Sequence, residues 1–438
     1  MAAYLSRLHH VSLNVSNVDK VAHELVSRFQ FNVFAARLTD RAKQLALRRG
    51  SAVFVVNERP NESPRRLNGH QSRVWSSVAA REHRDLNCLY GAHAHYPVDT
   101  VSNVCFEVED VQSASAALRD RGLCEFLQPP TEVRDDSGRV SFSILRSPVG
   151  NVCHTLIDRS RYQGLFLPGF HQVGSDSQTA DHSQCPITHF DHITYACPRS
   201  STAHISRWYR DTFGFQRFFI DRNEDVDEGY VLNHDGIGLR LTAMEYWKCS
   251  ESGIKLPFKD EKEPDCKFVI AESLPEQGRN QVDTFLDGHR GAGIQHIGLY
   301  TEDIVRTAQT LSRAGVQFFS PPPTYYTEVG KQEEMEAAGH DPHTLSQYGI
   351  LLDTDIHTDT DRRITDGQRY LLQVFTKPIF GEDTFFLELI ERRGATGFGE
   401  GNIRALWRSV QAYMENEEQD ETECRNKHST QSRRQRQP

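Results

Sequence analysis

An internal repeat is the feature of this sequence that most constrains its fold. Residues 8–12 (LHHVS) align with residues 190–194 (FDHIT), and residues 102–111 align with residues 295–304. In both copies the later segment reads as a strand that runs into an amphipathic helix ending in glycine. A repeat of this length predicts an α+β chain of two similar modules in tandem.

The repeat divides the chain into four parts. The expected boundaries are 1–167 for an N-terminal module, 168–187 for a linker, 188–414 for a C-terminal module, and 415–438 for a disordered polar tail. Within the second module, the polar segment 327–367 is expected to be an inserted surface loop with a helical turn or two.

Composition and charge exclude several classes of protein. The formal net charge is −10, which argues against a nucleic-acid-binding surface. No apolar run is long enough to span a membrane. Nine cysteines without a CxxC pair leave no complete disulfide framework, so reduced thiols in an intracellular compartment are expected.

Three ionisable side chains of the second half lie in apolar, strand-like runs: His192, His296 and Glu388. Alternate side chains of a strand share a face, so Glu388 points the same way as Phe386 and Ile390. An unpaired carboxylate in such a place is costly, and a divalent metal offsets that cost. Two imidazoles and one carboxylate are the facial triad that holds non-haem Fe(II) in many oxygenases. The set therefore predicts one Fe(2+) per chain.

This ligand set also predicts the partners of the site. Three ligands on one face of an octahedron leave three adjacent positions open. A 2-oxo acid can chelate through two of them, and O2 can take the third. The simpler interpretation is that each histidine is a satisfied core residue and that Glu388 pairs with Arg392 or Arg393. The joint occurrence of the three at matching repeat positions favours the metal.

The first module provides an internal control. The three ligand positions fall there on His10, Asn103 and Thr155, so only one potential ligand remains. The N-terminal module is therefore expected to be a structural or assembly domain without a metal site. His9 and His289, like the other isolated histidines, are expected at the surface or in supporting positions.

Six short motifs of the second half occur together in one known family. They are residues 190–192 (FDH), 291–296 (GAGIQH), 321–326 (PPPTYY), 373–378 (QVFTKP), 386–388 (FLE) and 397–402 (GFGEGN). With these motifs the chain resembles the 4-hydroxyphenylpyruvate dioxygenase family, from Leu8 to about Met414. The resemblance implies two vicinal-oxygen-chelate (glyoxalase/dioxygenase-like) modules, each an open curved sheet with flanking helices. It also implies a homodimer, which is common among soluble oligomers.

The resemblance also implies roles for individual residues. The iron ligands of the family carry over onto the three residues already singled out. Glutamines of the substrate pocket fall on Gln281 and Gln295, and two pocket phenylalanines fall on Phe375 and Phe386. The final helix, residues 402–413, is similar to a lid helix that closes over the site.

At three positions the chain departs from the family. Ala271 stands where the family has asparagine, Leu241 where it has a pocket serine, and Ile403 where it has an aromatic residue on the lid helix. Two hydrogen-bonding groups and one ring are thus replaced by apolar side chains. Because such contacts decide between similar substrates, a phenol or keto acid is expected to bind in a different orientation.

Residues 44–48 and 52–58 resemble an animal branch of this family, which is associated with mitochondria and with hydroxylation of a benzylic carbon. The expected function is oxidative decarboxylation of 4-hydroxyphenylpyruvate to 4-hydroxymandelate, a precursor of the ubiquinone ring. One alternative is a homogentisate-forming dioxygenase of tyrosine catabolism. Another is a non-catalytic binding or regulatory protein on the same fold. The cytoplasm is the alternative to a mitochondrial location.

Overall fold

The structure of the chain is a computed structural model. It describes residues 5–39, 42–59, 96–173, 185–220, 224–226, 228–234, 237–245, 266–274, 278–354, 369–382, 384–395, 397–399, 401–403 and 405. The expected tail and the expected lid helix beyond residue 405 lie outside these ranges. Within them, no helix has both the length and the apolar character that a membrane crossing requires.

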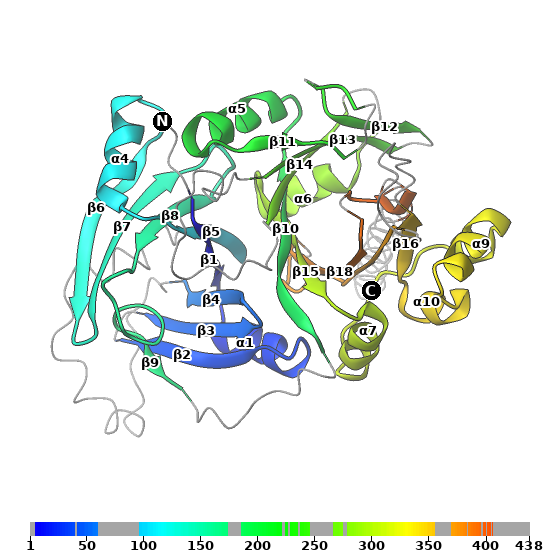
Figure 1. Cartoon of the computed structure of the whole chain (residues 1–438), viewed down its shortest axis with the longest axis horizontal. Coiled ribbons are helices and arrows are strands. Elements are labelled where there is room, and N and C mark those ends of the chain that lie inside the picture. Colours follow the sequence, from blue (N-terminus) through cyan, green and yellow to red (C-terminus); the bar gives the residue numbers. More distant parts are fainter. Residues whose placement is uncertain are drawn as a thin grey trace, which may run out of the picture.

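The first module is a nine-stranded sheet with helices packed on it, drawn from blue through cyan to the first green in Figure 1. Its elements are β1 (Arg7–Val15), α1 (Val18–Ser27), β2 (Asn32–Leu38), β3 (Lys43–Arg49), β4 (Ala52–Glu58), β5 (Thr100–Glu107), α4 (Val111–Asp120), β6 (Phe126–Asp135), β7 (Gly138–Arg146), β8 (Cys153–Asp158) and β9 (His171–Gln172). The strand order is β6-β7-β8-β5-β1-β4-β3-β2-β9. Strand β9 lies within the segment that composition predicts to be a linker.

The second module is also built on a nine-stranded sheet, drawn from green to red in Figure 1. Its elements are β10 (Ile187–Cys197), α5 (Thr202–Phe213), β11 (Gln216–Phe218), β12 (Tyr230–His234), β13 (Ile237–Glu245), β14 (Lys267–Ser273), α6 (Gln281–His289), β15 (Gly293–Thr301), α7 (Ile304–Arg313), α8 (Thr324–Thr327), α9 (Val329–Ala337), α10 (Pro342–Tyr348), β16 (Leu351–Thr354), β17 (Tyr370–Phe375) and β18 (Phe386–Arg393). The strand order is β11-β13-β14-β10-β15-β18-β17-β16, and β12 pairs with β13.

The two sheets share their central topology. Strand β1 pairs in parallel with β4 and antiparallel with β5, just as β10 pairs in parallel with β14 and antiparallel with β15. The next pair, β5 with β8 in one module and β15 with β18 in the other, is parallel in both. The predicted α+β fold of two tandem modules is therefore confirmed.

The polar segment 327–367 contains the helical turns that its sequence predicts, but its described part is packed on the sheet rather than lying as a surface loop. Its described part forms α9, α10 and β16, and β16 pairs with β17 at the edge of the sheet. Met335, Leu345 and Ile350 of this segment are fully buried. Because these anchors are scattered among polar residues, average composition did not indicate a packed element. Residues 355–367 lie outside the described ranges.

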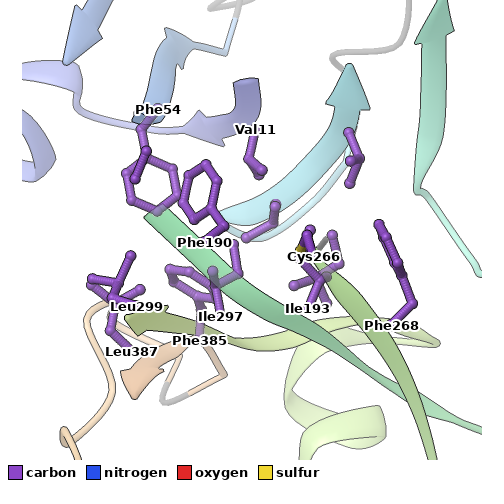
Figure 2. Close-up of a cluster of buried hydrophobic side chains, with 14 of the residues drawn as sticks. Val11, Phe54, Phe190, Ile193, Cys266, Phe268, Ile297, Leu299, Phe385 and Leu387 are labelled. Carbon is purple, nitrogen blue, oxygen red and sulfur yellow. The ribbon is translucent and has the colours of Figure 1, made fainter. Parts of the chain in front are cut away.

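A shared apolar core holds the two modules together. Val11 and Phe54 of the first module pack in one cluster with Phe190 and Ile193 of the second (Figure 2). The Phe54 and Phe190 ring centroids are 5.1 Å apart. His289 supports the same boundary, since its Nε2 lies 2.7 Å from the hydroxyl of Thr100. The central strands thus turn one face toward the other module and leave the opposite face for polar side chains.

Candidate metal centre

Three neighbouring strands bring together the three side chains that the sequence predicts as metal ligands. His192 comes from β10, His296 from β15 and Glu388 from β18, and their potential ligand atoms all lie within 4.8 Å of one another. Glu388 Oε2 lies 2.9 Å from His192 Nε2 and 3.7 Å from His296 Nε2. These atoms form one compact, buried donor set.

Strand register explains this convergence. His192 lies opposite Gly298, and Gly298 in turn lies opposite Glu388. The glycine leaves room for the imidazole, since a Cβ at this position would lie 2.4 Å from His192 Cε1. A bulge in β10 between Phe190 and His192 turns Asp191 to the same side of the sheet as His192.

Asp191 orients the first histidine. Its carboxylate lies 2.9 Å from His192 Nδ1 and accepts two hydrogen bonds of 2.8 Å from Arg392. Burial would raise the pKa of Asp191, but the Arg392 guanidinium holds it well below its usual value. A carboxylate on one imidazole nitrogen directs the other nitrogen toward a metal. Arg392 is therefore the partner of Asp191, whereas Glu388 faces the histidines.

The charge state of the two histidines indicates that the site requires a positive charge beside Glu388. Burial disfavours a cationic His192, but the carboxylates of Glu388 and Asp191 raise its pKa to about 9. Burial and the neighbouring His192 lower the pKa of His296 well below its usual value. Without metal, a proton on His192 thus serves as the cation beside Glu388, which is only 1% exposed. Fe(II) fits this nitrogen- and oxygen-donor set and would replace that proton.

A chain of polar side chains holds Glu388 in place. Gln373 donates from Nε2 to Glu388 Oε1 at 2.8 Å, and Asn402 donates from Nδ2 to Gln373 Oε1 at 3.0 Å. The hydroxyl of Tyr325 lies 2.9 Å from Asn402 Oδ1. Sequence reasoning missed these roles, although Gln373 gave the same signal as Glu388: a polar residue inside an apolar strand.

Aromatic rings enclose the histidines. Phe386 stacks on His296 with centroids 4.8 Å apart, and Phe375 meets the same imidazole at 87°. On the other side, Phe398 meets His192 at 82° with centroids 5.5 Å apart. The structure thus places both phenylalanines expected in the pocket beside the ligands. It adds Phe398, which lies in a recognised motif but was given no role.

The two glutamines expected in the pocket form a pair next to His296. Gln295 donates from Nε2 to Oε1 of Gln281, the first residue of α6, and both side chains are buried. The Oε1 atom of Gln295 lies 3.4 Å from His296 Nδ1. The amide pair therefore forms a polar side of the site.

The three positions that depart from the family lie together. Leu241 on β13 is directly opposite Ala271 on β14. Both belong, with Ile403, to one buried apolar cluster that also contains Phe398. The three side chains therefore form a single apolar region that adjoins His192 through the Phe398 ring.

We expect Gly298→Ala to weaken metal binding by at least about tenfold, the scale of effects seen when ligand orientation is disturbed. The added methyl would clash with His192 and push its imidazole away from Glu388. Metal content after Fe(II) loading and desalting measures the loss, and circular dichroism checks the fold. Gly381→Ala is the control, because a Cβ there meets no atom within 4 Å. Equal metal content in both variants would contradict the prediction.

Metal affinity is expected to depend on pH through His192. A divalent ion must displace the His192 proton, and the pKa of this imidazole is about 9 in the metal-free protein. The apparent affinity for Co(II) should therefore rise roughly tenfold per pH unit from about pH 6.5 and level off near pH 9. Co(II) titrations at constant ionic strength measure this slope. A flat profile between pH 6.5 and 8.5 would show that His192 carries no proton to displace.

Comparisons with known proteins agree with this geometry. Residues 189–334 match the Glyoxalase/Bleomycin resistance protein/Dioxygenase superfamily. The chain is 39% identical to the human "4-hydroxyphenylpyruvate dioxygenase-like protein" over 415 residues, which cover 94% of this chain and 98% of the human protein. It is 29% identical to the 4-hydroxyphenylpyruvate dioxygenase of Caenorhabditis briggsae over 410 residues, 92% of this chain and 90% of that protein.

A solved structure shares the fold across the whole chain. A mutant of 4-hydroxymandelate synthase from Streptomyces coelicolor matches with a TM-score of 0.65 and 20% identity. The match covers 94% of this chain and 99% of that one. Because the chain is 39% identical to its animal relatives over 94% of its length, it belongs to the 4-hydroxyphenylpyruvate dioxygenase-like family, within the glyoxalase/dioxygenase superfamily.

Proposed function

We propose that this chain is a non-haem Fe(II) dioxygenase that converts 4-hydroxyphenylpyruvate into 4-hydroxymandelate. The observation that carries the proposal is the convergence of His192, His296 and Glu388 into one buried donor set. The names of the relatives support the 2-oxo acid as substrate. The reaction consumes O2 and releases the substrate carboxyl group as CO2. Both oxygen atoms of O2 remain in the product, one in the new carboxylate and one in the new hydroxyl.

The protein's part in this reaction is to hold the metal ligands in place and to orient the substrate. Bound Fe(II) supplies electrons and a template on which a 2-oxo acid and O2 meet. Asp191 and Gln373 fix the orientation of His192 and Glu388 before any substrate arrives. Ligands held in this way lose little orientational freedom when substrate binds, which lowers the barrier to reaction.

In this proposal, the orientation of the substrate's aromatic ring determines which of the two products forms. The Gln281–Gln295 amide pair can hydrogen-bond a phenol or carboxylate on one side of the site. On the other side, Leu241, Ala271 and Ile403 offer apolar surface in place of the family's polar and aromatic groups. Because the oxidised carbon is the one held nearest the metal, this asymmetry favours the benzylic carbon over the ring.

The cellular setting follows from the same proposal. 4-Hydroxymandelate is a precursor of the ubiquinone ring, so we place the activity in mitochondria. One iron per chain and assembly as a homodimer are part of the proposal.

The defining experiment is a product assay. Protein loaded with Fe(II) without air is given 4-hydroxyphenylpyruvate and then ¹⁸O2, and the products are identified by mass spectrometry. We expect 4-hydroxymandelate carrying two ¹⁸O atoms. Glu388→Ala should give no product, whereas Glu333→Gln, at an exposed position of α9, should behave like the unmodified chain.

Other outcomes of this assay each have a definite meaning. Homogentisate as the product would establish the enzyme of tyrosine catabolism instead. Iron binding without turnover would mean that another 2-oxo acid is the substrate. Failure to bind iron would leave a binding or regulatory protein on this fold.

A second experiment addresses the apolar region. We expect the double variant Leu241→Ser/Ala271→Asn to increase the share of homogentisate, because it restores two hydrogen-bonding groups at directly paired positions. The ratio of the two products, measured by chromatography, is independent of small losses in total activity. Val231→Ser, on the adjacent strand β12 at an exposed position, is the control. A double variant that still makes only 4-hydroxymandelate would contradict this explanation of product choice.

A further inference from the structure

A second cluster of potential metal ligands lies in the first module. It consists of His9 and His10 on β1 and Cys105 on β5, whose ligand atoms all lie within 4.8 Å of one another. The exposed fractions are 8%, 5% and 0%, so of the two positions expected for His9, at the surface or in a supporting place, the structure excludes the surface. Phe166 packs against both imidazoles, with centroid distances of 5.3 and 5.6 Å. The cluster is therefore a compact, enclosed set of two nitrogen donors and one sulfur donor.

The strand geometry that builds this cluster is that of the candidate iron site. His10 lies directly opposite Cys105, and a bulge in β1 between Leu8 and His10 interrupts the register. Leu8 and Val11 both pack on the core between the modules. His9 and His10 thus project together on the opposite face, with their Nδ1 atoms 2.7 Å apart.

The repeat relates the two sites position by position. His10 corresponds to His192, His9 to Asp191, and Cys105 to Gly298, as the matching bulges and strand pairs show. The positions of the other two iron ligands are occupied here by Asn103 and Thr155. Their side chains hydrogen-bond to each other at 3.2 Å. The cluster thus lies at the same place in the sheet but uses a different donor set.

Glu107 completes the surroundings of the cluster. Its Oε1 atom lies 3.7 Å from His9 Nε2, and its carboxylate accepts hydrogen bonds of 2.9 and 2.8 Å from Arg7. A carboxylate facing the far nitrogen of a ligating imidazole is the usual support for a histidine on zinc. With His9 Nδ1 turned to the cluster, Glu107 is placed for that role.

We propose that His9, His10 and Cys105 bind one Zn²⁺ ion in the first module. Imidazole and thiolate are the preferred ligands of zinc, and a water molecule would supply the fourth tetrahedral position. At ordinary zinc bond lengths, two ligating nitrogens lie roughly 3.4 Å apart, so the imidazoles must separate by less than about 1 Å from their present positions. The ion would cross-link β1 to β5. This inference replaces the expectation that the first module is free of metal, and it does not depend on the proposed dioxygenase activity.

The test detects a sulfur ligand, which distinguishes this site from the His192–His296–Glu388 set. That set also suits zinc but contains no sulfur. The full-length chain is loaded with Co(II), and thiolate-to-cobalt charge-transfer absorption is recorded in the near ultraviolet. We expect this absorption in the unmodified chain and in Glu388→Ala, and its loss in Cys105→Ser. Cys153→Ser, a buried cysteine on the adjacent strand β8, is the matched control and should keep the absorption.

A second measurement keeps the test decisive if Cys105→Ser fails to fold. X-ray absorption at the zinc edge of the unmodified chain should show one sulfur at about 2.3 Å together with imidazole scattering. Among the described residues, no other group of three histidine, cysteine or acidic side chains that could hold a metal contains a cysteine. Absence of sulfur around zinc would overturn the proposal and leave a neutral His9–His10 hydrogen bond. Absorption that persists in Cys105→Ser would overturn it too, by assigning the thiolate elsewhere.

Discussion

The site depends above all on the burial of the Glu388 carboxylate. Its neighbours on the strand, Leu387 and Leu389, point into the core between the modules, so β18 cannot move to expose the acid. A buried carboxylate must be hydrogen-bonded and paired with positive charge. Gln373 gives the hydrogen bond, and a proton on His192 or a metal ion gives the charge. The core between the modules therefore keeps the metal site in a state that favours a cation.

The same strands serve the core and the site because their side chains alternate. On β10, Ile193 and Tyr195 enter the core, whereas His192 and Thr194 face the other side. The pairing of β10 with β15 has three register shifts, and the one between Phe190 and His192 turns Asp191 to the side of His192. This bulge thus places a candidate ligand and the group that orients it on the same face.

The fold and the convergence of His192, His296 and Glu388 could be predicted from the sequence alone, for two physical reasons. Charged or imidazole side chains within apolar runs indicate a compensating partner, and the repeat aligns these positions between the modules. Gly298, the Asp191–Arg392 pair and Gln373 were missed because their roles depend on which residues face each other across strands. The sequence does not specify that register directly. For the same reason the sequence left open whether His9 lies at the surface or in a supporting position, since the bulge determines which way it points.

The position of Gly298 bears on why the same framework presents different donor atoms in its two modules. In the second module Gly298 has no side chain, so the His192 imidazole reaches across β15 to Glu388. In the first module the Cys105 thiol occupies that space, and Thr155 stands opposite it in place of the acid. One site therefore presents nitrogen and carboxylate oxygen, which suit Fe(II), and the other presents nitrogen and sulfur, which suit Zn²⁺. The two donor sets differ because Cys105 stands at the position of Gly298, and because Asn103 and Thr155 stand at the positions of His296 and Glu388.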